Sequence, residues 1–174
     1  QKDKVITHLM DTYAQHDRLS GVALVQQGNE TVFAKAYGCA NYENLTLNEV
    51  HTIFNIGSIS KQFTAAAILH LVQEGKVDLN LSINNYLGKH ANKHWKKVTV
   101  HHLLSHTSGI PSLLQSGQGL DDVFPEERAV SLAELIAYFK DLKLLSRPGK
   151  KYNYNNSGYV LLAAIIEEVS RQSY

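Results

Sequence analysis

Apolar positions recur along this chain with two spacings, and each spacing predicts a different kind of element. Over residues 3–15 they recur every three or four positions, which predicts an N-terminal helix. Residues 21–27 and 31–37 are short stretches of strand-forming residues joined by a turn at 28–30, which predicts a β-hairpin. No other stretch has comparable strand character. Because a lone hairpin exposes unpaired backbone edges, we expect its partner strands to come from elsewhere.

A long helical pattern begins at about Ser58 and runs to residue 74, where Gly75 is a suitable stop. The apolar side chains expected on one face of this helix are Phe63, Ala67, Leu71 and Val72. The pattern predicts a helix whose first turn carries two polar side chains, the hydroxyl of Ser58 and the amine of Lys61.

Two more helices are expected in the second half of the chain. Ser131 and Glu134 form a capping-box pattern, and the side chains expected to face inward behind it are Leu135, Ile136, Phe139 and Leu142. The other helix covers residues 157–168, and Asn156 directly before it is able to cap it. Residues 113–127, rich in glycine, glutamine and aspartate, predict a long loop that acts as a lid or as a surface excursion.

Ser58 and Lys61 carry the first candidate chemistry. Residues three apart at the start of a helix share one face, so the two side chains are expected to touch. A serine hydroxyl becomes a good nucleophile when a base takes its proton, and a lysine serves as that base when burial or a helix N-terminus disfavours its ammonium form. The free backbone N–H groups there can also bind an oxyanion. The spacing alone is weak, because chance gives roughly one Ser-x-x-Lys in a chain of this composition.

A Tyr-x-Asn pattern occurs twice, and the context distinguishes the two copies. Tyr42-Glu43-Asn44 lies among other asparagines and predicts a polar turn. Tyr154-Asn155-Asn156 instead opens the apolar run that predicts the last helix. The second copy is therefore the candidate for a functional tyrosine.

Four stretches now occur in order: 54–61 around Ser58-Ile59-Ser60-Lys61, 103–111 around His106-Thr107-Ser108-Gly109, Pro148-Gly149, and 152–159 around Tyr154-Asn155-Asn156. As an ordered set they resemble the serine β-lactamase and penicillin-binding-protein superfamily, on its class C and serine-esterase side. The resemblance implies an α/β fold of the α+β type, in which an antiparallel sheet flanked by helices joins a helical region.

Matched position by position, the resemblance also implies roles for individual residues. Ser58 would be the acylated nucleophile and Lys61 its proton partner. Tyr154 would be the general base or acid that also serves the leaving group, and Asn156 would bind the substrate amide or Lys61. His106 looks like a structural residue of a buried turn.

One motif of the family is missing from this chain. A Lys-[Ser/Thr]-Gly or His-x-Gly triplet on a late strand should follow Tyr154 by many residues, and nothing after Tyr159 fits it. We therefore expect residues 1–174 to be the N-terminal portion of a single β-lactamase-like domain. A C-terminal segment of the same protein would supply the remaining strands, the third motif and the second oxyanion donor.

Composition excludes several other classes. A formal net charge of +1, with basic residues scattered apart from His94-Trp95-Lys96-Lys97, argues against a nucleic-acid partner. No apolar run has the length of a membrane span, and the single cysteine, Cys39, excludes an internal disulfide. We expect no cofactor, and the resemblance favours a periplasmic or secreted setting.

Histidines raise a metal-based alternative. His90 and His94, like His102 and His106, are four residues apart, a spacing that puts two imidazoles on one side of a helix. Neither pair has the glutamate of a His-Glu-x-x-His motif. The sequence therefore favours acyl transfer over metal catalysis.

The favoured function is a serine hydrolase that forms an acyl-enzyme with an ester, amide or β-lactam carbonyl of a small-molecule or peptide substrate. An esterase or D-alanyl-peptidase-like activity ranks before a β-lactamase, since the same apparatus serves all three. The alternative is a non-catalytic ligand-binding protein. The segment of residues 1–174 on its own is expected to be inactive.

Overall fold

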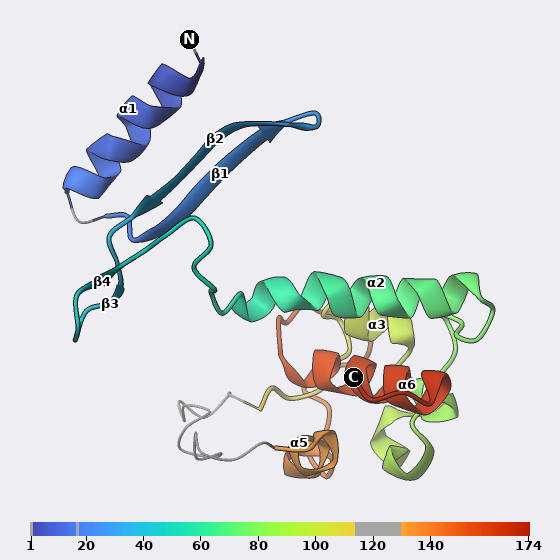
Figure 1. The fold of residues 1–174 in the computed structure, drawn as a ribbon. Helices are drawn as coiled ribbons and strands as arrows, with labels where there is room; N and C mark the ends of the chain where they lie inside the picture. Colours follow the sequence, from blue (N-terminus) through green and yellow to red (C-terminus); the bar gives the residue numbers. More distant parts are fainter. Residues whose placement is uncertain (1, 17, 114–129) are drawn as a thin grey trace. The chain divides into compact units, whose positions relative to one another are not determined.

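The computed structural model describes residues 2–16, 18–113 and 130–174. The chain divides into two compact units, Gln1–Ile56 and Gly57–Tyr174 (Figure 1). The first unit contains α1 (Lys2–Gln15), β1 (Gly21–Gln27), β2 (Glu30–Tyr37), β3 (Cys39–Asn41) and β4 (Thr46–Leu47). The second contains η1 (Gly57–Ile59), α2 (Ser60–Gln73), η2 (Ile83–Asn85), η3 (Gly88–His90), η4 (Lys93–Trp95), α3 (Val100–Leu104), α5 (Leu132–Phe139) and α6 (Ser157–Ser170).

The predicted N-terminal helix and hairpin are confirmed in the first unit. β1 and β2 pair antiparallel from Gly21 opposite Tyr37 to Gln27 opposite Glu30, with a register shift after Val25. Gly28 turns the chain with a φ of 59°, a backbone conformation that glycine adopts without strain. α1 packs against β2, so one helix covers part of the hairpin (Figure 1).

The first unit also contains a second, very short hairpin that the sequence did not reveal. β3 and β4 pair antiparallel over only three and two residues, too few for an alternating pattern to stand out. The side-chain oxygen of Asn41 accepts hydrogen bonds from the backbone N–H groups of Glu43 and Asn44. The first Tyr-x-Asn copy is therefore part of a polar turn, as expected.

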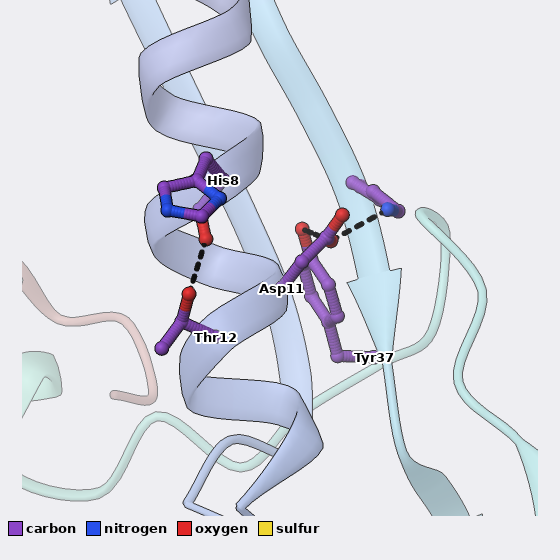
Figure 2. A network of polar contacts seen from close by, with 5 residues as sticks. His8, Asp11, Thr12 and Tyr37 are labelled. Atoms are coloured by element: carbon purple, nitrogen blue, oxygen red, sulfur yellow. Dashed lines mark hydrogen bonds and ion pairs between the residues drawn. The ribbon is translucent and has the colours of Figure 1, made fainter.

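A polar network joins α1 to β2 (Figure 2). Asp11 Oδ1 accepts hydrogen bonds from Lys35 Nζ at 2.7 Å and from the Tyr37 hydroxyl at 3.1 Å. Thr12, the residue after Asp11, donates its hydroxyl to the carbonyl of His8, one turn earlier in α1, at 2.7 Å. The Tyr37 side chain is buried, with 8% of its surface exposed, whereas the ion pair between Asp11 and Lys35 remains accessible to solvent.

The core of the second unit forms around α6, which packs against α2, α3 and α5 (Figure 1). Seven residues of α6 are buried: Ser157, Gly158, Leu161, Leu162, Ala163, Ala164 and Ile165. Trp95 and Phe139 are fully buried, and their ring centroids lie 6.0 Å apart. An apolar run without a polar face is typical of a helix surrounded on several sides, and α6 has that environment.

Two side chains of the expected apolar faces are exposed, whereas the others are buried or half-buried. On α2, Leu71 is buried and Ala67 and Val72 are half-buried, but Phe63 is 63% exposed. The capping box of Ser131 and Glu134 is confirmed, but α5 ends at Phe139 and leaves Leu142 beyond it and 47% exposed. Apolar spacing identifies several possible faces on a short helix, and the neighbours decide which one is buried. Most of the loop expected at 113–127 lies outside the described residues.

Candidate active site

Ser58 lies in a 3-10 turn that leads into a helix. The α-helix begins at Ser60 rather than at Ser58, and the turn before it, η1, starts at Gly57 with a φ of 50°. The Ser60 hydroxyl donates to the Gly57 carbonyl at 2.7 Å and closes this turn. Because η1 continues into α2 without a break, Ser58 and Lys61 still lie one turn apart. Lys61 Nζ donates to Ser58 Oγ at 3.1 Å, so the expected contact is present.

Tyr154 reaches the same hydroxyl from 96 positions along the chain. Its phenol donates to Ser58 Oγ at 2.7 Å, and Lys61 Nζ lies 5.2 Å from the centre of the Tyr154 ring. The structure thus brings the second Tyr-x-Asn copy to the Ser-x-x-Lys segment. One serine oxygen therefore receives hydrogen bonds from the Lys61 nitrogen and the Tyr154 phenol.

Asn156 contributes to this cluster through its side chain and does not cap α6. Its Oδ1 accepts a hydrogen bond from Lys61 Nζ at 2.8 Å, and its own backbone is helical, with a φ of −84° and no capping hydrogen bond from the side chain. The neighbouring Asn155 takes the capping role, because its Oδ1 accepts from the Gly158 N–H at 2.9 Å. The expectation that Asn156 caps the helix is therefore wrong by one residue.

Asn155 is a supporting residue that sequence reasoning missed. It is buried, with 2% exposed, and its Nδ2 donates to the carbonyls of Ile110 and Asn153. These bonds tie residues 153–155 to the turn around Ile110 and to the start of α6. The sequence offered two adjacent asparagines before the helix, and both are residue types that cap helices, so it did not distinguish Asn155 from Asn156.

The cluster around Lys61 contains no carboxylate. Among the described residues, no ion pair involves Lys61, and its hydrogen-bond partners are the neutral oxygens of Ser58 and Asn156. The adjacent Lys61, and then the hydrogen bond to Ser58, lower the pKa of Tyr154 below its ordinary value and outweigh burial, which acts in the opposite direction. The phenol of Tyr154 therefore loses its proton more readily than an isolated tyrosine. Ser58 is exposed and Tyr154 is 46% exposed, so a substrate carbonyl can approach both.

His106 forms the turn after α3, as expected, and its ring packs against the site. It is half-buried, its carbonyl accepts from the Asn153 N–H at 2.8 Å, and its ring centre lies 4.5 Å from that of Tyr154. Burial, and then the charge of Lys61, lower the pKa of His106 below its ordinary value. The sequence indicated a structural histidine but not its contact with Tyr154.

The histidine pairs do not form the helical arrangement that a metal site would need. His90 and His94 lie in two separate short helices, η3 and η4, so their spacing does not place them on one helical face. His102 Nδ1 accepts the Thr99 N–H and completes a capping box on α3. Within residues 2–16, 18–113 and 130–174, no group of three or more histidine, cysteine, aspartate or glutamate side chains could hold a metal ion. In the same ranges, no helix has both the length and the apolar character needed to cross a bilayer.

Comparisons with family models, with curated proteins and with solved structures all find proteins similar to this chain. A family model described as Beta-lactamase matches residues 3–174. Penicillin-binding protein 4* of Bacillus subtilis (strain 168) is 28% identical over 185 residues, which cover 99% of this chain and 38% of that protein. A solved penicillin binding protein from Bacillus halodurans is 34% identical with a TM-score of 0.81, covering 94% of this chain and 49% of the other.

A solved D-amino acid amidase from Ochrobactrum anthropi SV3 is also similar, at 27% identity and a TM-score of 0.77. The match covers 92% of this chain and 43% of the amidase. The chain thus spans less than half the length of each of these three relatives.

Proposed function

The chain belongs to the Beta-lactamase family, and from this premise we propose that it carries the nucleophile and proton-handling groups of a serine hydrolase acting through an acyl-enzyme. Its fold is the α+β fold of β-lactamase and penicillin-binding neighbours. The observation that carries the proposal is the shared contact at Ser58 Oγ, which lies 3.1 Å from Lys61 Nζ and 2.7 Å from the Tyr154 hydroxyl. A nucleophile with two proton-handling groups in contact is the arrangement that acyl transfer requires.

In the first step, Ser58 Oγ forms a bond to the substrate carbonyl carbon while the π electrons of the carbonyl move to its oxygen. The serine proton passes to the Tyr154 oxygen or to Lys61 Nζ, whichever has already lost its own proton, since both atoms contact Ser58 Oγ. The oxyanion is stabilised by backbone N–H donors, of which the Ser58 N–H is one. When the tetrahedral intermediate collapses, the bond to the leaving group breaks and that group takes a proton from Tyr154.

In the second step, the oxygen of a water molecule bonds to the acyl carbon while Tyr154, having given its proton to the leaving group, accepts a proton from the water. The bond between the acyl carbon and Ser58 Oγ then breaks, and Tyr154 returns the proton to Ser58, which restores the hydroxyl and releases the acid. The Asn156 side chain holds Lys61 through the 2.8 Å hydrogen bond and offers its amide N–H groups toward a substrate amide. Lys61, without a carboxylate partner, is left able to exchange protons with Ser58 and Tyr154.

The substrate class follows from the chemistry of the site and from the relatives. We propose hydrolysis of an ester or amide of a small molecule or peptide first, and of a β-lactam second. The similarity to a D-amino acid amidase and to penicillin-binding proteins supports this order. We further infer that residues 1–174 are the N-terminal portion of one such domain, completed by a C-terminal segment with the second oxyanion donor. The same similarity supports a periplasmic or secreted setting.

Replacement of Ser58 tests the proposal in the full-length protein. Ser58→Ala is expected to abolish covalent labelling by a fluorophosphonate and by a fluorescent penicillin, because the attacking oxygen is removed. Ser60→Ala is the matched control, since this exposed hydroxyl lies two residues away and donates to the Gly57 carbonyl rather than facing Lys61. Labelling that persists in Ser58→Ala would place the nucleophile elsewhere.

A measurement of substrate turnover distinguishes the hydrolase from the alternative, a non-catalytic binding protein. Steady hydrolysis of p-nitrophenyl butyrate or nitrocefin by the wild-type protein, lost in Ser58→Ala and kept in Ser60→Ala, supports the hydrolase. Saturable binding of either compound without hydrolysis, unchanged in Ser58→Ala, would support the binding protein instead.

A further inference from the structure

His106 occupies a backbone position that normally favours glycine. It has a φ of 55°, directly after the last turn of α3, where its N–H donates to the Leu103 carbonyl. Helices commonly end with glycine in this left-handed conformation, because a side chain there introduces strain. A histidine at this position therefore suggests that its side chain, and not its backbone, is required.

The His106 ring contacts the tyrosine segment of the site in two ways. Its centre lies 4.5 Å from the Tyr154 ring and 5.1 Å from the Tyr159 ring, so the imidazole lies against both aromatic rings. Its Nδ1 accepts a hydrogen bond from the Asn155 backbone N–H at 3.4 Å. Both contacts act on the segment that presents the Tyr154 phenol to Ser58.

We propose that His106 is a positioning residue, whose neutral imidazole holds Tyr154 against Ser58 and whose protonation releases it, so that the site is switched off in acid. The proposal rests on the proposed function, because Tyr154 must act on Ser58 for its position to matter. A nitrogen that accepts the Asn155 N–H carries no proton, so the observed contact requires the neutral ring at Nδ1.

Among the described residues, the side chains around His106 are the cationic Lys61 and three tyrosine rings. Lys61 approaches from α2 with a positive charge, and Tyr159 on α6 offers a neutral ring. Tyr152 and Tyr154 approach from the segment before α6, and Tyr152 packs edge-on with its ring centre 6.0 Å away. A proton on Nδ1 would point at the Asn155 N–H, and the imidazolium would add a second positive charge near Lys61. Protonation therefore destabilises the arrangement that the neutral ring supports.

Burial and Lys61 both lower the pKa of His106, so the site is expected to lose activity as the pH falls, not as it rises. The neutral ring is preferred in the folded protein, and the supporting contacts are complete above the ordinary histidine value of about 6.5. As pH falls below that value, the contacts are lost over the range of the lowered folded-state pKa. An acid limb below about pH 6.5 in the acylation rate is the expected signature.

Two substitutions of His106 in the full-length protein separate positioning from structure. His106→Asn tolerates the left-handed backbone and keeps an acceptor oxygen where Nδ1 lies, but it does not titrate. His106→Gly removes the ring and the acceptor while relieving the backbone strain. His101→Asn is the control, because His101 is exposed on α3 next to this turn. The measurement is the acylation rate with p-nitrophenyl butyrate from pH 4.5 to 9, alongside thermal unfolding of each variant.

We expect His106→Gly to remain folded but to acylate about 100-fold more slowly, the scale associated with misplacing a catalytic group by about 1 Å. His106→Asn is expected to keep most of the rate at pH 8 and to lose the additional fall in rate below about pH 6.5, so that only the dependence on Tyr154 remains, while His101→Asn matches the wild type throughout.

Three results would overturn the proposal. They are an unchanged rate in His106→Gly, a fall in rate below about pH 6.5 that is as steep in His106→Asn as in the wild type, or unfolding of both variants, which would make His106 a purely structural residue. A wild-type protein that is not acylated at Ser58 at all contradicts the proposed function instead, so the two failures are distinguishable.

Discussion

Each unit of the chain contains a lysine and a tyrosine that donate hydrogen bonds to one shared oxygen. In the first unit, Lys35 and Tyr37 donate to Asp11 Oδ1 at 2.7 and 3.1 Å. In the second, Lys61 and Tyr154 donate to Ser58 Oγ at 3.1 and 2.7 Å. The two lysine nitrogens lie at similar distances from the tyrosine rings, 5.0 and 5.2 Å. The difference between the clusters is the acceptor, a carboxylate in one and a hydroxyl in the other.

The acceptor reverses the proton chemistry of the tyrosine. The hydrogen bond to Asp11 raises the pKa of Lys35, and burial followed by Asp11 raises the pKa of Tyr37, so both groups keep their protons. In the Ser58 cluster no carboxylate of the described part of the chain pairs with Lys61, and Lys61 lowers the pKa of Tyr154. The same two residue types thus form a structural link across α1 and β2 and a candidate proton relay around Ser58.

Removal of each lysine is expected to give the largest difference between the two clusters. Lys61→Ala is expected to reduce the acylation rate by about 10³-fold, because it removes a proton-handling group from the nucleophile. Lys35→Ala is the matched control and is expected to acylate as the wild type does. Single-turnover acylation followed by labelling measures both. Equal rates in the two variants would show that Lys61 takes no part in proton transfer.

Removal of the two phenol oxygens is expected to have the next largest effect. Tyr154→Phe should acylate about 10²-fold more slowly, the lower end for losing a general acid or base. Because the pKa of Tyr154 is lowered, the wild-type rate should rise with pH through a value below about 10, and this rise should be absent in Tyr154→Phe.

Tyr37→Phe provides the comparison in the first unit. It should leave acylation unchanged and lower the free energy of unfolding by about 1 kcal/mol, because one buried tyrosine loses its hydrogen bond. A pH-rate profile that is identical in Tyr154→Phe and in the wild type would remove the tyrosine from the mechanism.

A third test makes the Ser58 cluster more like the Asp11 cluster by giving its lysine a carboxylate partner. Asn156→Asp places a carboxylate where an amide oxygen now lies 2.8 Å from Lys61 Nζ, as Asp11 does for Lys35. The carboxylate offsets the charge of Lys61 that lowers the pKa of Tyr154, so the acylation rate near pH 7 should fall by about tenfold. The rise of the rate with pH that depends on Tyr154 should move upward by about 1 to 3 units. Asn153→Asp, in the same segment but without a hydrogen bond from its side chain to Lys61, is the control. An unshifted profile in Asn156→Asp would contradict the role of the uncompensated lysine.

The smallest effect is expected at Asp11. Its pKa is lowered, first by the hydrogen bond from Lys35, so its contribution to stability is complete above the unfolded value of about 4 and is lost as pH falls through the folded value. Asp11→Asn should therefore lower the melting temperature at pH 7 by no more than about 3 °C, since surface ion pairs contribute little. The difference from the wild type should disappear near pH 2, as thermal scans at both pH values can show. A difference that persists in acid would indicate a packing role for Asp11.

The sequence predicts the Ser58 and Lys61 half of the site better than the half around Tyr154, Asn155 and Asn156. The contact of Ser58 with Lys61 was predictable even though the helix begins two residues later than expected, because a 3-10 turn and an α-turn both bring residues three apart onto one side. The capping role was assigned to Asn156 when Asn155 performs it, because both residues are suitable caps and only their distant partners distinguish them. Phe63 belongs to the predicted apolar face of α2 together with Leu71, but Phe63 is exposed and Leu71 is buried, because burial depends on which elements pack against each turn of the helix.

By itself, the sequence determined the elements whose contacts are short in range: the first helix and hairpin, the capping box at Ser131, and a hydroxyl and an amine one turn apart. Backbone geometry fixes such contacts once the element forms. The tertiary structure decided which tyrosine reaches Ser58, that Asn156 binds Lys61, and that His106 packs against Tyr154. Those contacts join residues 48 to 96 positions apart. They form only when α2, α3 and α6 pack together, because that packing decides which hydrogen-bond donors lie next to which acceptors.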